Sequence, residues 1–148
     1  REKARRRGLV GRLELVEGDA LSLPFPDDRF ACVTVGWGLR NVADLSGALR
    51  QMARVVWPGG RVALLDMTPL GVPGPLRGLF RWYFHHVTPL LGSWLAKERE
   101  AYAYLPESVE IFPTAEALRE LMLGCGMEEV TYRYCGMGTH ALHVGVVA

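Results

Sequence analysis

Alternating and continuous apolar positions along the chain predict five strands. Residues 12–17 alternate apolar and polar side chains, which is typical of a half-buried strand. Residues 30–35 and 61–66 are β-prone apolar runs, typical of strands that are buried on both faces of a parallel sheet. Residues 127–135 and 139–147 predict two more strands, which the Gly-Met-Gly sequence between them joins into an antiparallel hairpin.

Two other segments repeat apolar residues at helical spacing. The first follows Asp44, a residue type that caps helices well, and its apolar positions are Leu45, Leu49, Met52, Ala53 and Val56. The second follows Thr114, and its apolar face carries Leu118, Leu121, Met122 and Cys125 before Gly126. Because Pro58-Gly59-Gly60 ends the first helix, residues 30–66 form a strand–helix–strand unit. We therefore expect an α/β domain that ends in a hairpin, with a further helical segment over residues 76–104.

Composition and charge narrow the class of protein. The chain has 148 residues, 49% hydrophobic and 22% charged, as in a single globular domain. Six of the first twelve residues are Arg or Lys, against one acidic residue. We interpret them as the exposed last turns of a helix that ends at Gly8, since no aromatic residue lies among them and no second basic patch follows, so we expect no nucleic-acid partner. The uncharged stretch over residues 82–96 is shorter than the ~20 apolar residues of a membrane span.

The three cysteines, Cys32, Cys125 and Cys135, lie in apolar surroundings and lack the Cys-x-x-Cys spacing of metal sites and redox pairs. We expect them to be reduced thiols in or near the core of a cytoplasmic protein. We expect no metal site.

Candidate chemistry lies where the first two predicted strands end. After residues 12–17 comes Gly18-Asp19-Ala20, at the edge of the sheet where α/β proteins bind ligands. The Asp19 carboxylate can accept a hydrogen bond from the exocyclic amine of adenine, and the next backbone N–H, that of Ala20, can donate to a ring nitrogen. A Gly-Asp pair after a strand is more often a plain turn, and both interpretations stay open.

The second predicted strand is followed by Gly36-Trp37-Gly38-Leu39-Arg40-Asn41. Its glycines let a ligand approach the backbone closely, while Arg40 and Asn41 supply hydrogen-bond donors at the same edge. A glycine turn with an exposed arginine would have the same sequence.

Two other segments are less specific. Residues 54–61 contain an arginine and a Pro-Gly-Gly run, and we interpret them as a plain helix end and turn. Tyr102 and Tyr104 can line an apolar pocket, and core packing explains them equally well.

Taken in order, these segments resemble UbiE-type S-adenosylmethionine-dependent C-methyltransferases of menaquinone and ubiquinone biosynthesis over nearly the whole chain. The matching elements are Gly18-Asp-Ala20, Leu23-Pro-Phe-Pro26, Gly38-Leu-Arg-Asn41, Arg54-Val-Val, Pro58-Gly-Gly60, Pro89-Leu-Leu-Gly92, Tyr104-Leu-Pro-Glu-Ser108, Phe112-Pro113 and Ala141-Leu-His-Val-Gly145. The combination of Gly-Leu-Arg-Asn with Tyr-Leu-x-Glu-Ser is the most specific part. Pro106 and Phe112-Pro113 favour the menaquinone branch.

The resemblance implies the class I methyltransferase fold, which is Rossmann-like and has the sheet order 3-2-1-4-5-7-6. Residues 1–148 would form the C-terminal two-thirds of one methyltransferase domain. Residues 76–105 would be a helical insertion that covers the substrate or faces the membrane, although a plain helical cap over the sheet has the same pattern. Departures from the family's pattern are Ala31 for Asp, Gly36 for Ser, Trp57 for Lys, Asp66 for Glu and Thr68 for Ser.

The resemblance also implies roles for single residues. Asp19 and Ala20 would contact the adenine of S-adenosylmethionine, and Gly36 would lie near the same cofactor. Arg40 and Asn41 would be catalytic at the reacting quinol, and Tyr102 and Tyr104 would line its pocket. A guanidinium stays protonated, so we expect Arg40 to stabilise a phenolate or to position a water, with Asn41 fixing the substrate's orientation. The alternative proton acceptors are His85, His86, His140 and His143.

The glycine-rich loop and the acidic residue with which this family holds the rest of the cofactor do not precede Arg1. We therefore expect an N-terminal truncation that is incomplete as an enzyme. Residues 12–17 would lie apart from residues 30–35, whose inner edge would be unpaired.

The implied substrate is a polyprenyl quinol, with the conversion of demethylmenaquinol to menaquinol favoured. Peripheral contact with the inner face of the membrane and a homo-oligomer both stay open. The alternative is a non-catalytic α/β module that binds a partner or a membrane through its apolar helical segment.

Overall fold

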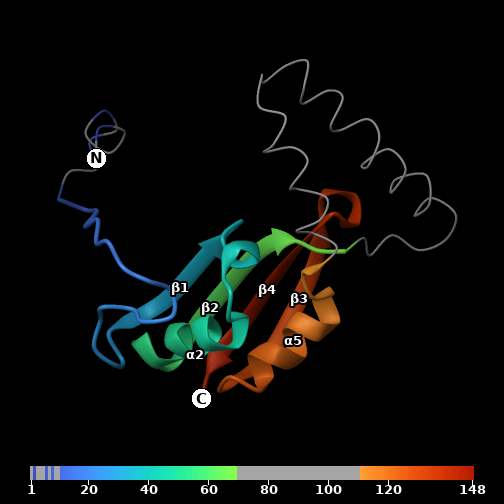
Figure 1. Ribbon diagram of the computed structural model, residues 1–148. Coiled ribbons are helices and arrows are strands. Elements are labelled where there is room, and N and C mark those ends of the chain that lie inside the picture. Colours follow the sequence, from blue (N-terminus) through green and yellow to red (C-terminus); the bar gives the residue numbers. More distant parts are fainter. Residues whose placement is uncertain (1, 3–5, 7, 9–10, 70–110) are drawn as a thin grey trace, which may run out of the picture.

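The computed structural model describes residues 2, 6, 8, 11–69 and 111–148, and these form a four-stranded mixed sheet (Figure 1). The strand order is β1-β2-β4-β3. β1 (Phe30–Gly36) pairs in parallel with β2 (Val56–Met67), and β4 (His140–Val147) pairs antiparallel with both β2 and β3 (Met127–Cys135). This confirms the predicted strand–helix–strand unit and the hairpin. It also matches the 4-5-7-6 part of the expected sheet order.

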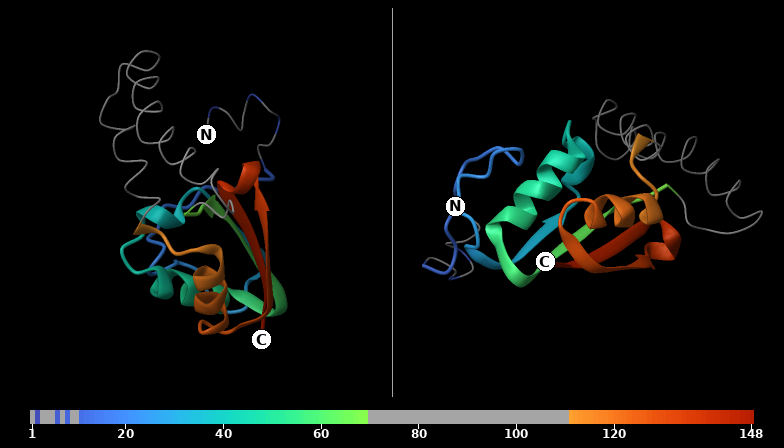
Figure 2. Two further views of the ribbon diagram at one scale, coloured as in Figure 1. Left: turned by 90° about the vertical axis from the view of Figure 1, so that its right-hand side faces the viewer. Right: turned by 90° about the horizontal axis from the view of Figure 1, so that it is seen from below.

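Both long helices that the structure describes lie on the same face of the sheet (Figure 2). α2 (Leu45–Val55) connects β1 to β2, and α5 (Ala115–Leu123) precedes β3. Each begins as the sequence predicts. Asp44 Oδ1 accepts a hydrogen bond from Gly47 N at 2.9 Å, and Thr114 Oγ1 accepts one from Ala117 N at 3.2 Å. These bonds satisfy backbone donors that the first helical turn leaves unpaired.

The core fills the space between the two helices and this face of the sheet. Its largest fully buried apolar side chains are Leu49, Leu64, Met122, Met127, Val55, Val56 and Val62. They come from α2, β2, α5 and β3, so the core ties the strand–helix–strand unit to the hairpin. Burying one such side chain contributes about 1.5–3 kcal/mol, which makes this layer the main source of stability.

The prediction that residues 30–35 are buried on both faces is wrong. Ala31, Cys32 and Thr34 are exposed, whereas Val33 and Val35 pack against the core. Successive side chains of a strand point to opposite faces, and in the described part of the chain the helices cover only one of them. The prediction for the cysteines is also wrong in part: Cys125 is buried, but Cys32 and Cys135 are exposed. Cys32 lies on the uncovered face of β1, and Cys135 ends a run of three exposed residues in β3.

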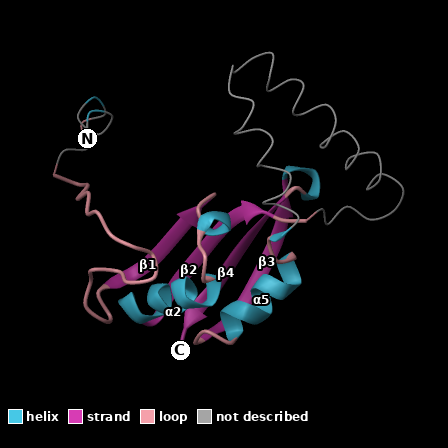
Figure 3. Cartoon of the chain, in the orientation of Figure 1, coloured by secondary structure: helices cyan, strands magenta, loops and turns pink. Residues whose placement is uncertain are grey.

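Residues 12–17 form no strand of the sheet, so that prediction is also wrong (Figure 3). The segment is exposed throughout, and its apolar residues Leu13 and Leu15 are 53% and 55% exposed. A strand needs a neighbour for its backbone hydrogen bonds, and within the described residues β1 pairs only with β2. In the described part of the chain, residues 12–17 therefore do not pair with β1.

Pro58-Gly59-Gly60 is not the helix-ending turn that the sequence predicts. α2 ends at Val55 and β2 begins at Val56, while residues 57–60 bulge out of the ladder between the pairs Phe30–Val56 and Cys32–Arg61. A Cβ on Gly60 would overlap Val56 Cγ1 and lie 2.8 Å from the carbonyl oxygen of Ala31. Glycine is required here because the backbone of β1 passes so close.

Candidate active site

The carboxyl ends of β1 and β2 lie side by side, because the two strands are parallel and Gly36 pairs with Leu65. Gly36 is exposed, and a Cβ added to it would touch nothing within 4 Å. Trp37 follows with a φ of 54°, in the left-handed region, and its N–H donates to Leu65 O at 2.9 Å. A non-glycine residue in this conformation costs about 1–3 kcal/mol, and such strain concentrates where ligands bind. The edge therefore has the open backbone and the strained turn of a ligand site.

A buried ion pair spans this edge. Arg40 lies on the 3-10 helix η1 (Leu39–Asn41), directly after β1, and Asp66 lies near the end of β2. Arg40 Nε donates to Asp66 Oδ1 at 2.5 Å, with the two side chains 9% and 2% exposed. The same Oδ1 accepts the backbone N–H of Met67 at 2.8 Å. Breaking a pair as buried as this one typically costs about 3–5 kcal/mol, so the pair holds the guanidinium in one position.

Asp66 is a site residue that the sequence interpretation missed. The sequence identified it only as a departure from a family pattern. The available signal was a carboxylate at the end of an otherwise apolar strand, where burial requires a partner. Arg40 and Asn41 are neighbours on η1, and Asn41 N donates to Gly38 O at 3.2 Å, which closes the turn after β1.

Asp19 and Ala20 lie on a separate loop that folds on itself. Asp19 Oδ1 accepts from Leu21 N at 2.9 Å, and Ala20 packs against the core. A Cβ on Gly18 would lie 2.8 Å from Pro24 Cδ, so the glycine lets the two ends of the loop meet. The structure thus brings Gly36, Arg40 and Asn41 to the strand ends, and it carries Asp19 and Ala20 on a loop of their own.

Arg54 on α2 holds this loop in place. Its guanidinium donates to the carbonyl oxygens of Phe25 at 2.9 Å and Leu23 at 3.0 Å, and to Asp27 Oδ1 at 2.6 Å. Gln51 Oε1 also accepts from Arg54, at 2.9 Å from Nη2 and 3.2 Å from Nε. The sequence interpretation of residues 54–61 as a plain helix end therefore missed a second residue. Its sequence signals were an arginine on the last turn of a helix and the Arg54-Val-Val match to the family.

The two described histidines have different surroundings. His143 is 1% exposed beneath α5, and its Nε2 lies 2.8 Å from the carbonyl oxygen of Ala115. Burial lowers the pKa of His143 below its ordinary value of 6.5, against opposing effects of that hydrogen bond and of Glu116. It pairs with Leu64 in the middle of the sheet, so its position is that of a core residue. His140 pairs with Met67 at the strand ends, and its ring meets that of Trp37 edge-on at 6.2 Å.

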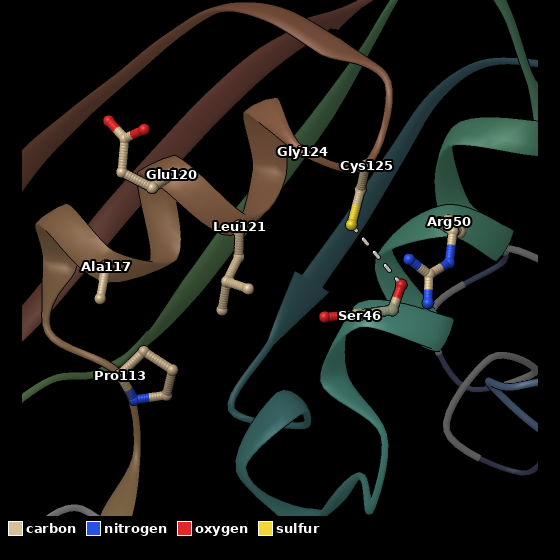
Figure 4. A pocket seen from close by; sticks show the side chains of 8 residues that line it. All are labelled: Ser46, Arg50, Pro113, Ala117, Glu120, Leu121, Gly124 and Cys125. Carbon is tan, nitrogen blue, oxygen red and sulfur yellow. Dashed lines mark hydrogen bonds between the residues drawn. The ribbon is translucent and has the colours of Figure 1, made fainter.

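A groove of about 500 Å³ runs between α2 and α5, away from the strand ends (Figure 4). Arg50 lies on the α2 side and Glu120 on the α5 side, and Cys125 Sγ donates to Ser46 O at 3.6 Å between the two sides. Burial raises the pKa of the Cys125 thiol, which keeps the sulfur protonated and weakly nucleophilic. No predicted site residue that the structure describes lines this groove.

Several predictions fall on residues 70–110, which lie outside the described residues. They concern Tyr102, Tyr104, His85, His86 and the insertion over residues 76–105. Among the helices that the structure does describe, none has the length and apolar content needed to cross a bilayer.

Comparison with known proteins identifies close sequence relatives. The ubiE/COQ5 methyltransferase family matches residues 1–147. The demethylmenaquinone methyltransferase of Lysinibacillus sphaericus is 44% identical over 134 residues, which are 90% of this chain and 57% of that protein. The ubiquinone/menaquinone biosynthesis C-methyltransferase UbiE of Yersinia enterocolitica is 42% identical over 146 residues, which are 98% of this chain and again 57% of that protein. The chain thus spans little more than half the length of these curated relatives.

Solved structures agree on the fold. A SAM-dependent methyltransferase of Thermotoga maritima, described as a possible histamine N-methyltransferase, superposes with a TM-score of 0.64 at 19% identity. The superposition covers 99% of this chain and 68% of that one. At this identity the likeness shows the fold alone, which is the predicted α/β class I methyltransferase fold.

Proposed function

Because the chain belongs to the ubiE/COQ5 methyltransferase family, we propose that it forms the catalytic part of an S-adenosylmethionine-dependent C-methyltransferase of quinone biosynthesis. The substrate we propose is demethylmenaquinol, whose ring carbon gains the methyl group. The name of the L. sphaericus relative supports this choice, while the UbiE name of the Y. enterocolitica relative covers both quinone branches. The observation that carries the proposal is the buried Arg40–Asp66 pair at the strand ends.

The residues present fit the proposed cofactor. The backbone of Gly36 is exposed, and a Cβ added to this residue would have no other atom within 4 Å. Asp19 is exposed, and the bond from Leu21 N fixes the orientation of its carboxylate. We assign Asp19 and Ala20 to the adenine and Gly36 to the adjoining part of the cofactor. When bound, S-adenosylmethionine supplies the electrophilic methyl group.

Arg40 and Asn41 are the residues we assign to catalysis. Attack by a ring carbon requires the quinol to lose a phenolic proton, so negative charge develops on the ring oxygen. A guanidinium held by Asp66 needs no reorganisation to stabilise that charge, which is the most effective kind of electrostatic catalysis. Asn41, next to Arg40 on η1, orients the ring. The lipid-soluble tail of the substrate leads us to expect peripheral contact with the membrane.

The test uses the chain joined to the part of the L. sphaericus relative that it does not cover, hereafter the fusion protein. It measures transfer of a labelled methyl group to a reduced demethylnaphthoquinone with a short tail. We expect transfer by the fusion protein and at least about a hundredfold lower kcat for Arg40→Lys, because an ammonium lacks the planar fork. Arg119→Lys is the matched control, since Arg119 makes ion pairs with Glu116 and Glu120 on α5.

Two results would contradict the proposal. Full turnover by Arg40→Lys would show that catalysis does not need the guanidinium. Tight binding of quinol without any methyl transfer by the fusion protein would instead favour the non-catalytic module.

A further inference from the structure

Two buried oxygen atoms near the end of β2 stand out because they lack hydrogen-bond partners. Within the described part of the chain, neither Asp66 Oδ2 nor Thr68 Oγ1 has one. The residues are 3% and 2% exposed. The large majority of buried side-chain polar atoms in proteins are paired, so two unpaired oxygens at one strand end point to a ligand that supplies the missing bonds.

The two atoms belong to one face of the strand. Asp66 and Thr68 are two positions apart, and Thr68 N donates to Thr139 O at 3.1 Å, which extends the backbone pairing one residue past β2. Residues i and i+2 of an extended segment share a face. Val62 and Leu64 of the core lie on this same face. Both oxygens therefore lie on the face of the sheet that the helices cover.

The Asp66 carboxylate is fixed by its other oxygen. Oδ1 accepts from Arg40 Nε at 2.5 Å and from Met67 N at 2.8 Å, so the orientation of Oδ2 is set without any contact of its own. An ionised carboxylate accepts hydrogen bonds and donates none. Thr68 Oγ1 both accepts and donates. A ligand group that meets Asp66 Oδ2 must therefore carry a proton.

We propose that Asp66 Oδ2 and Thr68 Oγ1 bind a ring hydroxyl of the substrate and thereby select the reduced ring over the oxidised one. This inference rests on the proposed function. A quinol O–H can donate to Asp66 Oδ2, whereas a quinone offers only carbonyl lone pairs, which a carboxylate repels. Only the reduced ring has the nucleophilic carbon that accepts a methyl group. The subsite thus rejects the form of the substrate that cannot react.

A ribose hydroxyl of the cofactor carries the same O–H donor as the quinol. The two sources differ in which affinity depends on Asp66. If the oxygens serve the substrate, substitution changes the Kd of the quinol and leaves the Kd of S-adenosylmethionine alone. If they serve the cofactor, substitution changes the Kd of S-adenosylmethionine and leaves the Kd of the quinol unchanged.

The experiment measures the Kd values of a short-tailed demethylnaphthoquinol, of its quinone and of S-adenosylmethionine for the fusion protein, by calorimetry under anaerobic conditions. We expect the wild type to prefer the quinol by at least about tenfold, the equivalent of one well-made hydrogen bond to a charged group. In Asp66→Asn the amide can also donate to a quinone carbonyl, so the preference should fall to about threefold or less. Thr68→Val should weaken quinol and quinone alike and keep their ratio, because Oγ1 pairs with either.

Each outcome decides the matter. A folded Asp66→Asn protein that keeps the full preference overturns the inference, as does a change confined to the Kd of S-adenosylmethionine. If Asp66→Asn does not fold, Thr68→Val leaves the ion pair intact, and undiminished quinol binding by that variant overturns the inference. Methyl transfer by the wild type separates these results from a failure of the proposed function, in which the fusion protein neither binds nor methylates the quinol.

Discussion

The loop that carries Asp19 and Ala20 should depend on Arg54 more than on any exposed ion pair. The Arg54 side chain is 30% exposed, and it reaches two backbone carbonyls, those of Leu23 and Phe25. A hydrogen bond to a charged group is worth about 1.5–3 kcal/mol when buried, and partial exposure reduces this to about 1 kcal/mol each. The Asp27 carboxylate is 70% exposed, so its pairing with Arg54 adds less than about 1 kcal/mol.

These values rank the effects of three substitutions on the free energy of unfolding. Arg54→Ala should cost about 2–3 kcal/mol, the sum of the three contributions. Arg54→Lys keeps the charge and reaches one carbonyl at a time, so it should cost about 1–2 kcal/mol. Asp27→Asn is the control that removes only the ion pair, and its cost should stay below about 1 kcal/mol.

Urea unfolding of the fusion protein, followed by circular dichroism, measures these costs. Amide hydrogen exchange locates them: the amides of Ser22 and Phe25, which donate to carbonyls within the loop, should exchange faster in Arg54→Ala. The Kd of S-adenosylmethionine should rise in the same order as the unfolding cost. An Asp27→Asn variant as destabilised as Arg54→Ala would contradict this prediction, because the ion pair and not the carbonyl contacts would then hold the loop.

Three further predictions test the fold and its titrating groups. Gly60→Ala should destabilise the protein by at least about 3 kcal/mol in thermal unfolding, because its Cβ would overlap Val56 and meet the backbone of β1, and a cost near zero would contradict the bulge geometry. The lowered pKa of His143 means that the unfolded chain binds the proton more readily, so stability is full above pH 6.5 and falls as the pH drops below it. His143→Phe should flatten this dependence of stability on pH. An unchanged dependence would mean that another titrating group causes it. Thiol titration of the native protein should show fast reaction of Cys32 and Cys135 and slow reaction of Cys125, with all three reacting in urea.

Periodicity and capping predicted the elements that are stabilised locally. Asp44 and Thr114 cap the helices as expected, and the Gly-Met-Gly sequence joins the hairpin as expected. These features depend on neighbours within a few residues along the chain, which is the range over which a sequence pattern carries information. The order of the four strands also agreed with the resemblance, although no local pattern specifies it.

The failed predictions all concern contacts with distant parts of the chain. The alternation over residues 12–17 is a strand pattern, but a strand forms only against a neighbour that pairs with it. The apolar run of β1 has the composition of a doubly buried strand, yet the helices cover one face of the sheet in the described part of the chain. Pro58-Gly59-Gly60 has the composition of a turn and forms a bulge instead, because β1 passes beside Gly60.

The amino-acid sequence was enough to identify the candidate chemical groups: a carboxylate and a small residue at Asp19 and Ala20, and a guanidinium and an amide at Arg40 and Asn41. Which of these groups act together depends on how the strands and helices pack. Asp66 lies 26 residues from Arg40 along the chain, and parallel pairing of β1 with β2 brings the two into a buried ion pair. Arg54 lies 29 residues from Phe25 and meets it because α2 packs back along the sheet. Both contacts depend on burial, which lowers the local dielectric and so gives a charged partner its energetic weight.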